Sequence, residues 1–134
     1  MLRQIELDAL QLLSRTDYMV GSDSIWVGSK PHPRAYGTFP RFLKLRRDFG
    51  VLSLEEMIQR MTDNPARRFN LKKRGRIKKD YFADLVVFDS ETIADTATYA
   101  DARQFPTGIP YVLVNGKISV DRGTCTGILA GQAI

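Results

Sequence analysis

A short apolar run that ends in an acidic turn is the feature that most constrains how this chain can fold. Residues Tyr18 to Val20 are predicted to form a strand, and the polar turn Gly21-Ser22-Asp23 follows directly. A strand that delivers a carboxylate to the mouth of a loop is typical of α/β barrels, whose active sites lie at the carboxyl ends of the strands. The alternative is that Asp23 makes an Asx-turn or caps the next segment, because Ser-Asp-Ser sequences do so readily.

Helical patterns surround this turn. Residues 2–14 have the apolar spacing of an amphipathic helix, so the chain begins as a helix, loop and strand of an α/β unit. A second helix is expected after the loop, with Thr38 as its N-cap. It is predicted to run to about Phe49, since Gly50 can adopt the left-handed conformation that ends helices.

The third predicted helix has the strongest local signals. Ser53 and Glu56 form a capping-box pattern, and an apolar stripe follows at helical spacing over residues 54–61. The helix is expected to end near residue 62, because Asn64 precedes a proline and such residues avoid the α region. Residues 65–69 can restart a short helical turn.

From Gly75 onward the pattern changes from helical to extended. A short strand is expected over 76–78 and a continuous, buried strand over 83–89, with a loop over 90–110. Asn115-Gly116 lies between two apolar runs and favours a hairpin with a type I′ turn. The chain is therefore predicted to divide into a helical α/β part, residues 1–72, and a β part, residues 73–134.

Composition limits the chemistry that the chain can carry alone. Its 134 residues can form a core, but a complete eight-stranded barrel needs about 250. No apolar run approaches the roughly 20 residues of a membrane span, so no membrane partner is expected. The lone Cys125 cannot form an internal disulfide, which favours a cytoplasmic location, and we expect it to be buried or half-exposed without a catalytic role. One cysteine and one histidine cannot complete a zinc site of the Cys/His kind.

The net charge of +5 is concentrated in one stretch. Eight lysines and arginines lie between Arg67 and Lys79, with no acidic residue among them. Such a run can meet phosphates or an acidic surface, or it can be a solvated connector. Phe69, Leu71 and Ile77 are interleaved with it and indicate a segment that packs on something. No zinc finger, helix-turn-helix or RNA-binding aromatic signature accompanies it, so nucleic acid is not the expected partner.

A set of motifs along nearly the whole chain resembles the N-acyl-D-amino-acid deacylases (D-aminoacylases) of the amidohydrolase superfamily. The combination of Gly-Ser-Asp, His-Pro-Arg and Gly-Thr-Phe-Pro-Arg is specific to this branch, whereas the Asn-Pro-Ala and Ala-Asp-Leu-Val-Val motifs are shared across the superfamily. The matching segments are Val20–Asp23, His32–Arg34, Gly37–Arg41, Leu52–Glu56, Met61–Thr62, Asn64–Arg68, Gly75–Ile77, Ala83–Asp89 and Val112–Gly116.

The resemblance implies an incomplete fold of the α/β class. Residues 1–72 would be the terminal strand, loop and helices of a metal-dependent TIM-like barrel, and residues 73–134 would be strands of a small β-sandwich. It also implies a zinc cofactor in the complete enzyme. The family's His-x-His pair, ligating cysteine and later histidines have no counterpart here, and catalytic zinc needs about three protein ligands. Zinc is therefore not expected to bind this chain alone.

The same resemblance assigns a role to Asp23, and side-chain chemistry suggests roles for two further residues that follow it. Asp23 matches the carboxylate that lies beside the metal and serves the attacking water, so it is the candidate catalytic residue and a metal ligand only within a completed site. Arg34 is the candidate for the substrate's α-carboxylate, because a guanidinium fork matches that group; a surface arginine or a loop-closing salt bridge is the alternative. His32 is expected to orient the loop or approach the substrate, and a purely structural role is the alternative.

Two functions follow as hypotheses. The first is a fragment of a metal-dependent hydrolase that cleaves the linear amide bond of N-acyl-D-amino acids to a carboxylate and a D-amino acid. It is expected to be inactive as an isolated chain and to need a missing barrel segment or self-association. The alternative is a non-catalytic binding or assembly module that uses the amidohydrolase scaffold and the basic stretch 67–79.

Overall fold

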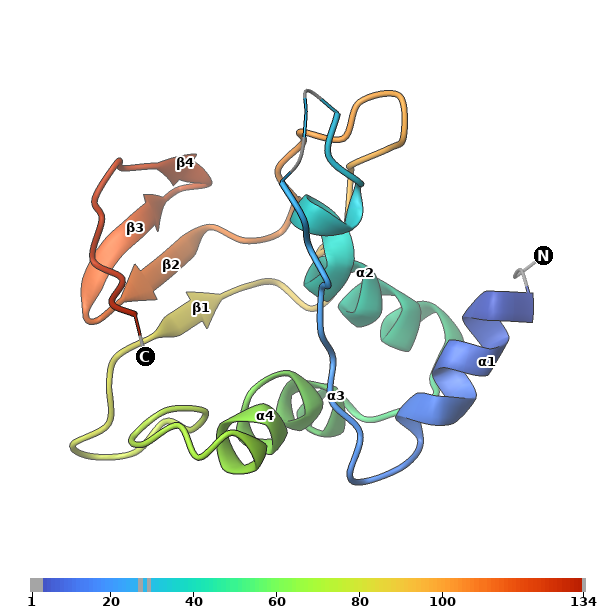
Figure 1. Ribbon diagram of the computed structural model, residues 1–134, viewed down its shortest axis with the longest axis horizontal. Helices are drawn as coiled ribbons and strands as arrows, with labels where there is room; N and C mark the ends of the chain where they lie inside the picture. The colour runs from blue at the N-terminus through green and yellow to red at the C-terminus, as the bar shows by residue number, and fades with distance from the viewer. Residues whose placement is uncertain (1–3, 27, 29, 134) are drawn as a thin grey trace.

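A computed structural model describes residues 4–26, 28 and 30–133. Helices gather on one side of the molecule and a sheet lies on the other (Figure 1). The described elements are the helices α1 (Gln4–Leu13), α2 (Arg34–Phe49), α3 (Leu54–Met61) and α4 (Asp63–Arg68) and the strands β1 (Leu85–Val87), β2 (Tyr111–Val114), β3 (Lys117–Asp121) and β4 (Thr124–Cys125).

Helix α2 begins four residues earlier than its predicted cap, so the assignment of Thr38 as N-cap is wrong. Pro33 already has helical angles at the N-cap position, with φ −51° and ψ −28°. The ring Nδ1 of His32 accepts the Arg34 N–H at 3.0 Å, which satisfies one of the free amides of the first turn. Thr38 lies inside the helix and donates its hydroxyl to the Arg34 carbonyl at 2.8 Å. The helix ends as predicted at Gly50, whose φ is 63°.

Helix α3 confirms the predicted capping box. The Ser53 hydroxyl accepts the Glu56 N–H at 3.1 Å, and the Ser53 N–H donates to the Glu56 carboxylate at 2.8 Å. The helix ends at Met61, and a short helix follows as the sequence indicated. That helix, α4, begins at Asp63, so Asn64 is helical although it precedes a proline, against the prediction.

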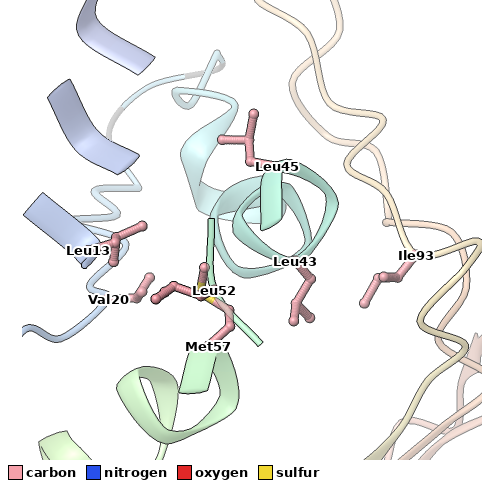
Figure 2. Packing of buried hydrophobic residues seen from close by; sticks show 7 residues of the cluster. All are labelled: Leu13, Val20, Leu43, Leu45, Leu52, Met57 and Ile93. Carbon is pink, nitrogen blue, oxygen red and sulfur yellow. The ribbon is translucent and has the colours of Figure 1, made fainter. Parts of the chain in front are cut away.

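The core joins the helices to the long loop that precedes the hairpin (Figure 2). Met57 of α3 is fully buried, and Ile93 of the loop is 1% exposed. The cluster of buried apolar side chains consists of Leu13, Val20, Leu43, Leu45, Leu52, Met57 and Ile93. It lies between α1, α2 and α3 and reaches across α2 to the loop that carries Ile93.

The predicted strand over residues 18–20 is not formed in the described chain. These residues belong to no strand, although the Val20 N–H does donate to the Arg60 carbonyl at 3.1 Å. A parallel strand needs neighbouring strands to complete its ladder, and the four strands described here pair with one another in a different sheet.

The strands form an antiparallel sheet in the order β1-β2-β3-β4. Asn115 and Gly116 have φ values of 49° and 76°, which confirms the predicted type I′ hairpin between β2 and β3.

Two strand predictions are wrong in detail. Residues 76–78 form no strand, and the predicted buried strand over 83–89 is the short β1, with Val86 and Val87 54% and 49% exposed. Val86 and Val87 point to opposite faces of the sheet, so β1 is uncovered on both faces. Cys125 of β4 is also exposed, against expectation.

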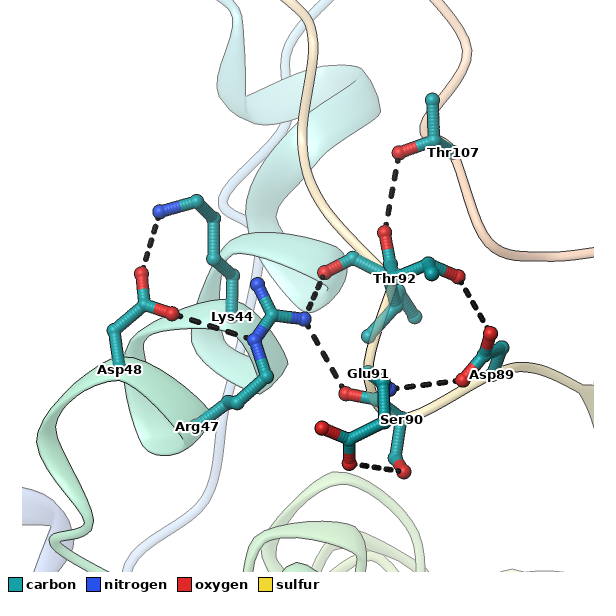
Figure 3. Close-up of polar contacts among 9 residues, drawn as sticks. Lys44, Arg47, Asp48, Asp89, Ser90, Glu91, Thr92 and Thr107 are labelled. Carbon is teal, nitrogen blue, oxygen red and sulfur yellow. Dashed lines mark hydrogen bonds and ion pairs between the residues drawn. The ribbon is translucent and has the colours of Figure 1, made fainter.

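Residues 90–110 are largely loop, as predicted, and polar contacts attach this segment to α2 (Figure 3). The Arg47 guanidinium donates to the carbonyls of Ser90 and Ile93 at 3.3 and 3.0 Å. Asp89 orders the start of the loop by accepting from the Glu91 N–H and the Thr92 hydroxyl, each at 2.9 Å. The loop is therefore fixed against the helix that carries Arg34 at its first turn.

Candidate active site

The structure brings two of the three predicted site residues into direct contact. Asp23 lies in the loop before α2, and Arg34 is the first residue of that helix. Their charged groups form an ion pair, with 2.9 Å between Asp23 Oδ2 and Arg34 Nη2. This contact is the loop-closing salt bridge that the sequence allowed as an alternative for Arg34. The substrate role of Arg34 stays a prediction.

The backbone at Asp23 explains how its carboxylate reaches outward. Its φ of 45° is in the left-handed region, which aspartate tolerates better than most side chains because it is short and polar. The Asp23 side chain is 79% exposed and that of Arg34 is 37% exposed. The Nε atom of Arg34 is buried and has no hydrogen-bond partner among the described residues. The guanidinium therefore keeps donor capacity beyond the ion pair.

His32 lies beside the pair and connects it to a distant loop. Its Nδ1 accepts the Arg34 N–H, and its Nε2 lies 3.0 Å from the Tyr99 hydroxyl oxygen. Because Nδ1 is an acceptor, the proton of the neutral ring is on Nε2, which donates to Tyr99. The two rings also pack edge to face at 5.0 Å. These contacts are the ones expected if His32 has a structural role. Its approach to a substrate stays a prediction.

Sequence reasoning missed the aromatic residues that surround this loop. Trp26 packs edge-on against Tyr36 at 5.2 Å, and Tyr36 packs against Phe105 at 5.6 Å. Figure 1 shows the loop before α2 beside the loop that contains Tyr99 and Phe105. The only signal for Tyr99 and Phe105 is that they are aromatic residues in a polar loop, and that pattern does not say what they contact.

These residues do not fit a metal ion by themselves. In the part of the chain that the structure describes, no three His, Cys, Asp or Glu side chains are placed to share an ion. Zinc requires about three protein ligands, and Asp23 supplies one carboxylate already paired with Arg34. The arrangement offers a proton-accepting carboxylate beside a cation that can bind an anionic group. No helix among the described residues is long and apolar enough to cross a bilayer.

Comparison with known proteins defines the class. The amidohydrolase family matches residues 2–120, so the chain belongs to this family. A D-aminoacylase from Alcaligenes xylosoxydans xylosoxydans is 42% identical over 130 residues, covering 96% of this chain and 27% of that protein. An N-acyl-D-glutamate deacylase from the same organism is 44% identical over 99 residues, covering 73% of this chain and 20% of its own length.

Solved structures agree with this assignment. A D-aminoacylase crystal structure has a TM-score of 0.88 and 40% identity, covering 93% of this chain and 27% of the solved one. The N-acyl-D-glutamate deacylase of Bordetella bronchiseptica has a TM-score of 0.79 and 38% identity, covering 83% of this chain and 24% of the solved one. That structure contains zinc and a phosphonate inhibitor that mimics the tetrahedral intermediate. The predicted resemblance to the deacylase branch is confirmed. The chain spans about a quarter of the length of these relatives.

Proposed function

We propose that this chain forms part of an N-acyl-D-amino-acid deacylase and supplies its Asp23 loop. Residues 1–72 would complete the barrel and residues 73–134 would add strands to a β-sandwich. The helices that run to Arg68 and the antiparallel sheet from Leu85 onward support this division. The reaction is hydrolysis of the amide to a carboxylate and a free D-amino acid. The remaining barrel residues come from outside this sequence.

The contact between Asp23 and Arg34 is the observation that carries the proposal. In an N-acyl amino acid, the amide nitrogen and the carboxylate are bonded to the same carbon atom. The group that protonates the departing nitrogen and the group that binds the carboxylate must therefore lie a few ångströms apart. The 2.9 Å ion pair between Asp23 and Arg34 supports assigning these two roles to them.

Each residue then has a defined role. Asp23 accepts a proton from the attacking water and returns it to the departing amine nitrogen, as a general base and then acid. Arg34 binds the α-carboxylate through N–H donors that its contact with Asp23 leaves available. His32 holds the Arg34 backbone through its Nδ1 atom. Zinc belongs to the complete enzyme, where Asp23 is the one ligand that this chain would contribute.

A chimera tests the proposal. The aligned segment of the Alcaligenes xylosoxydans xylosoxydans D-aminoacylase is replaced by this chain, and release of D-amino acids from N-acetyl-D-amino acids is measured. The parent chimera should be active, and Asp23→Asn should lower kcat by about 10²- to 10⁴-fold, the usual contribution of a positioned acid–base group. Arg34→Lys should raise KM more than it lowers kcat, because lysine lacks the fork.

The matched control is Asp17→Asn. Asp17 is also an exposed aspartate paired with an arginine, at 3.0 Å from Arg15, and the substitution should leave activity within about twofold because surface pairs contribute little. Asp23→Asn with full activity would refute the role of Asp23. The isolated 134-residue chain is expected to release no D-amino acid. Metal-dependent release that Asp23→Asn abolishes would show instead that the chain is active alone.

A further inference from the structure

The basic stretch 67–79 forms a cavity that the proposed deacylase function leaves unused. The cavity has a volume of about 320 Å³ and lies between the end of α4 and the loop that follows it. In Figure 1 this loop lies at the lower edge of the molecule, whereas the first turn of α2 lies in the upper half. The charged residues that line the cavity are Asp63, Arg67, Lys72, Lys73, Arg74 and Arg76.

One buried carboxylate fixes two of the guanidinium groups. Asp63 is 8% exposed and accepts from Nε and Nη2 of Arg76 at 2.6 and 2.8 Å. Its second oxygen lies 2.9 Å from Nε of Arg67, one helical turn further along α4. A single carboxylate balances only one of these two charges. Both forks are held in place and retain N–H groups that do not contact Asp63.

The other cations add to this excess. Arg74 pairs with Asp84, and its guanidinium lies 4.4 Å from the centroid of the Phe82 ring, so it too is held in one position. Lys72 and Lys73 are exposed at the rim, and the Lys72 ammonium donates to the neutral Asn70 side chain at 2.6 Å. Five cations thus face two carboxylates, which leaves an excess of three positive charges around one cavity.

We propose that this cavity binds a small oligophosphate anion, namely a pyrophosphate or triphosphate group, either free or carried by a larger molecule. Each phosphoryl group carries a charge of about −1.5 to −2 near neutral pH, so two linked groups match the excess. Fixed arginine forks suit phosphate oxygens, and lysines add mobile point charges. The volume is at the lower end of small-ligand pockets, roughly 300–1,000 Å³. A ligand with one carboxylate group would leave two of the three excess positive charges unbalanced.

Calorimetric titration with sodium pyrophosphate at low salt tests the site, on the 134-residue chain and on the chimera. We expect one pyrophosphate per chain, and weaker binding as salt is added. The double variant Lys72→Glu and Lys73→Glu should bind at least about tenfold more weakly, since it reverses two charges at the rim. Both side chains are exposed, so the fold is retained. The control variant, Lys30→Glu and Lys117→Glu, changes the net charge equally at exposed positions outside the cavity lining and should stay within twofold.

Two further ligands distinguish the sources of the anion. ATP that binds as tightly as pyrophosphate would show that a carried oligophosphate is accepted, and weaker ATP binding would assign the cavity to the free anion. A single-stranded oligonucleotide that binds more than tenfold tighter than either would overturn the proposal in favour of a polynucleotide surface. Absence of pyrophosphate binding in both proteins, or equal weakening by the control variant, would also overturn it. Because the cavity uses neither Asp23 nor Arg34, these outcomes are independent of the deacylase activity.

Discussion

Arg60 of α3 bonds the end of α1 through its buried side chain. Its side chain is 2% exposed, its Nε donates to the Leu13 carbonyl at 2.7 Å, and its Nη1 donates to the Glu56 carbonyl at 3.0 Å. The Leu13 carbonyl is among the last four of α1, which have no partner within that helix. The buried guanidinium of Arg60, on α3, therefore caps the carboxyl end of α1.

We expect Arg60→Met to lower the free energy of unfolding by about 1–3 kcal/mol, because the Leu13 carbonyl at the end of α1 loses its donor and an unsatisfied buried group costs about that much. The Glu56 carbonyl lies inside α3 and keeps its partner within the helix. Urea unfolding followed by circular dichroism measures the difference. Gln59→Met provides the control, since it places the same side chain on an exposed position of the same helix. Equal unfolding midpoints for the two variants would show that Arg60 contributes no net stability.

At the same scale, the sequence identified site residues that are close along the chain and missed those that are distant. Asp23, His32 and Arg34 lie close together along the chain in recognisable motifs, and the structure places all three within one network. Tyr99 contacts His32 across 67 positions of sequence. That contact depends on how residues 90–110 fold back on α2, which long-range packing decides and no local pattern encodes.

Among the elements, α3 offers a pH-dependent test. The Ser53 N–H donates to the Glu56 carboxylate and, with the Ser53 side chain and the charge of Arg60, lowers the pKa of Glu56 below its ordinary value of 4.5. A carboxyl group with a lower pKa in the folded state stabilises the fold above its unfolded pKa. The contribution is lost as the pH falls through the folded pKa. The melting temperature of the parent chain should therefore drop between about pH 5 and pH 3.

Glu56→Gln should reduce this drop, because glutamine keeps an acceptor for the cap but does not titrate. Glu55→Gln is the control, since Glu55 is the exposed neighbour in the same helical turn and takes no part in the capping box. Thermal melts of the three proteins at each pH supply the comparison. If Glu56→Gln and the parent chain lose the same number of degrees, the capping box is not the source of the acid sensitivity.

The elements that were predicted correctly are those with complete local signals. Each of these signals depends on residues at most four positions apart, and each appears in the structure. They are the capping box at Ser53, the left-handed Gly50 and the Asn115-Gly116 turn. The errors have non-local causes. The run at residues 18–20 lacks the neighbouring strands that would pair with it. β1 is exposed on both faces of its sheet, because Val86 and Val87 point to opposite faces and neither is covered. At the early start of α2, His32 accepts the Arg34 N–H, a side-chain contact that propensity does not predict.

At the scale of the whole molecule, many apolar side chains lack cover. Exposed positions include Val86 on β1 at 54%, Ile118 on β3 at 45% and Trp26 at 57%. β1 pairs with β2 alone among the described strands, so its other edge presents free backbone groups. Exposed strand edges and apolar patches are sites of association. This surface is what would remain if a quarter of a larger amidohydrolase were taken out of its surroundings.

We therefore expect the isolated chain to self-associate. Size-exclusion chromatography with light scattering should give masses of at least about twice the 15.2 kDa monomer, increasing with concentration. Val86→Lys should shift the population toward monomer, because a lysine on an edge strand opposes strand pairing. Leu129→Lys removes an equally apolar side chain that is 99% exposed in the C-terminal tail, and it should leave the mass distribution unchanged. A single 15.2 kDa species that melts cooperatively at every concentration would contradict the expectation. It would also show that these residues form a self-sufficient domain, so that the deacylase partnership would need an interface other than the exposed sheet edge.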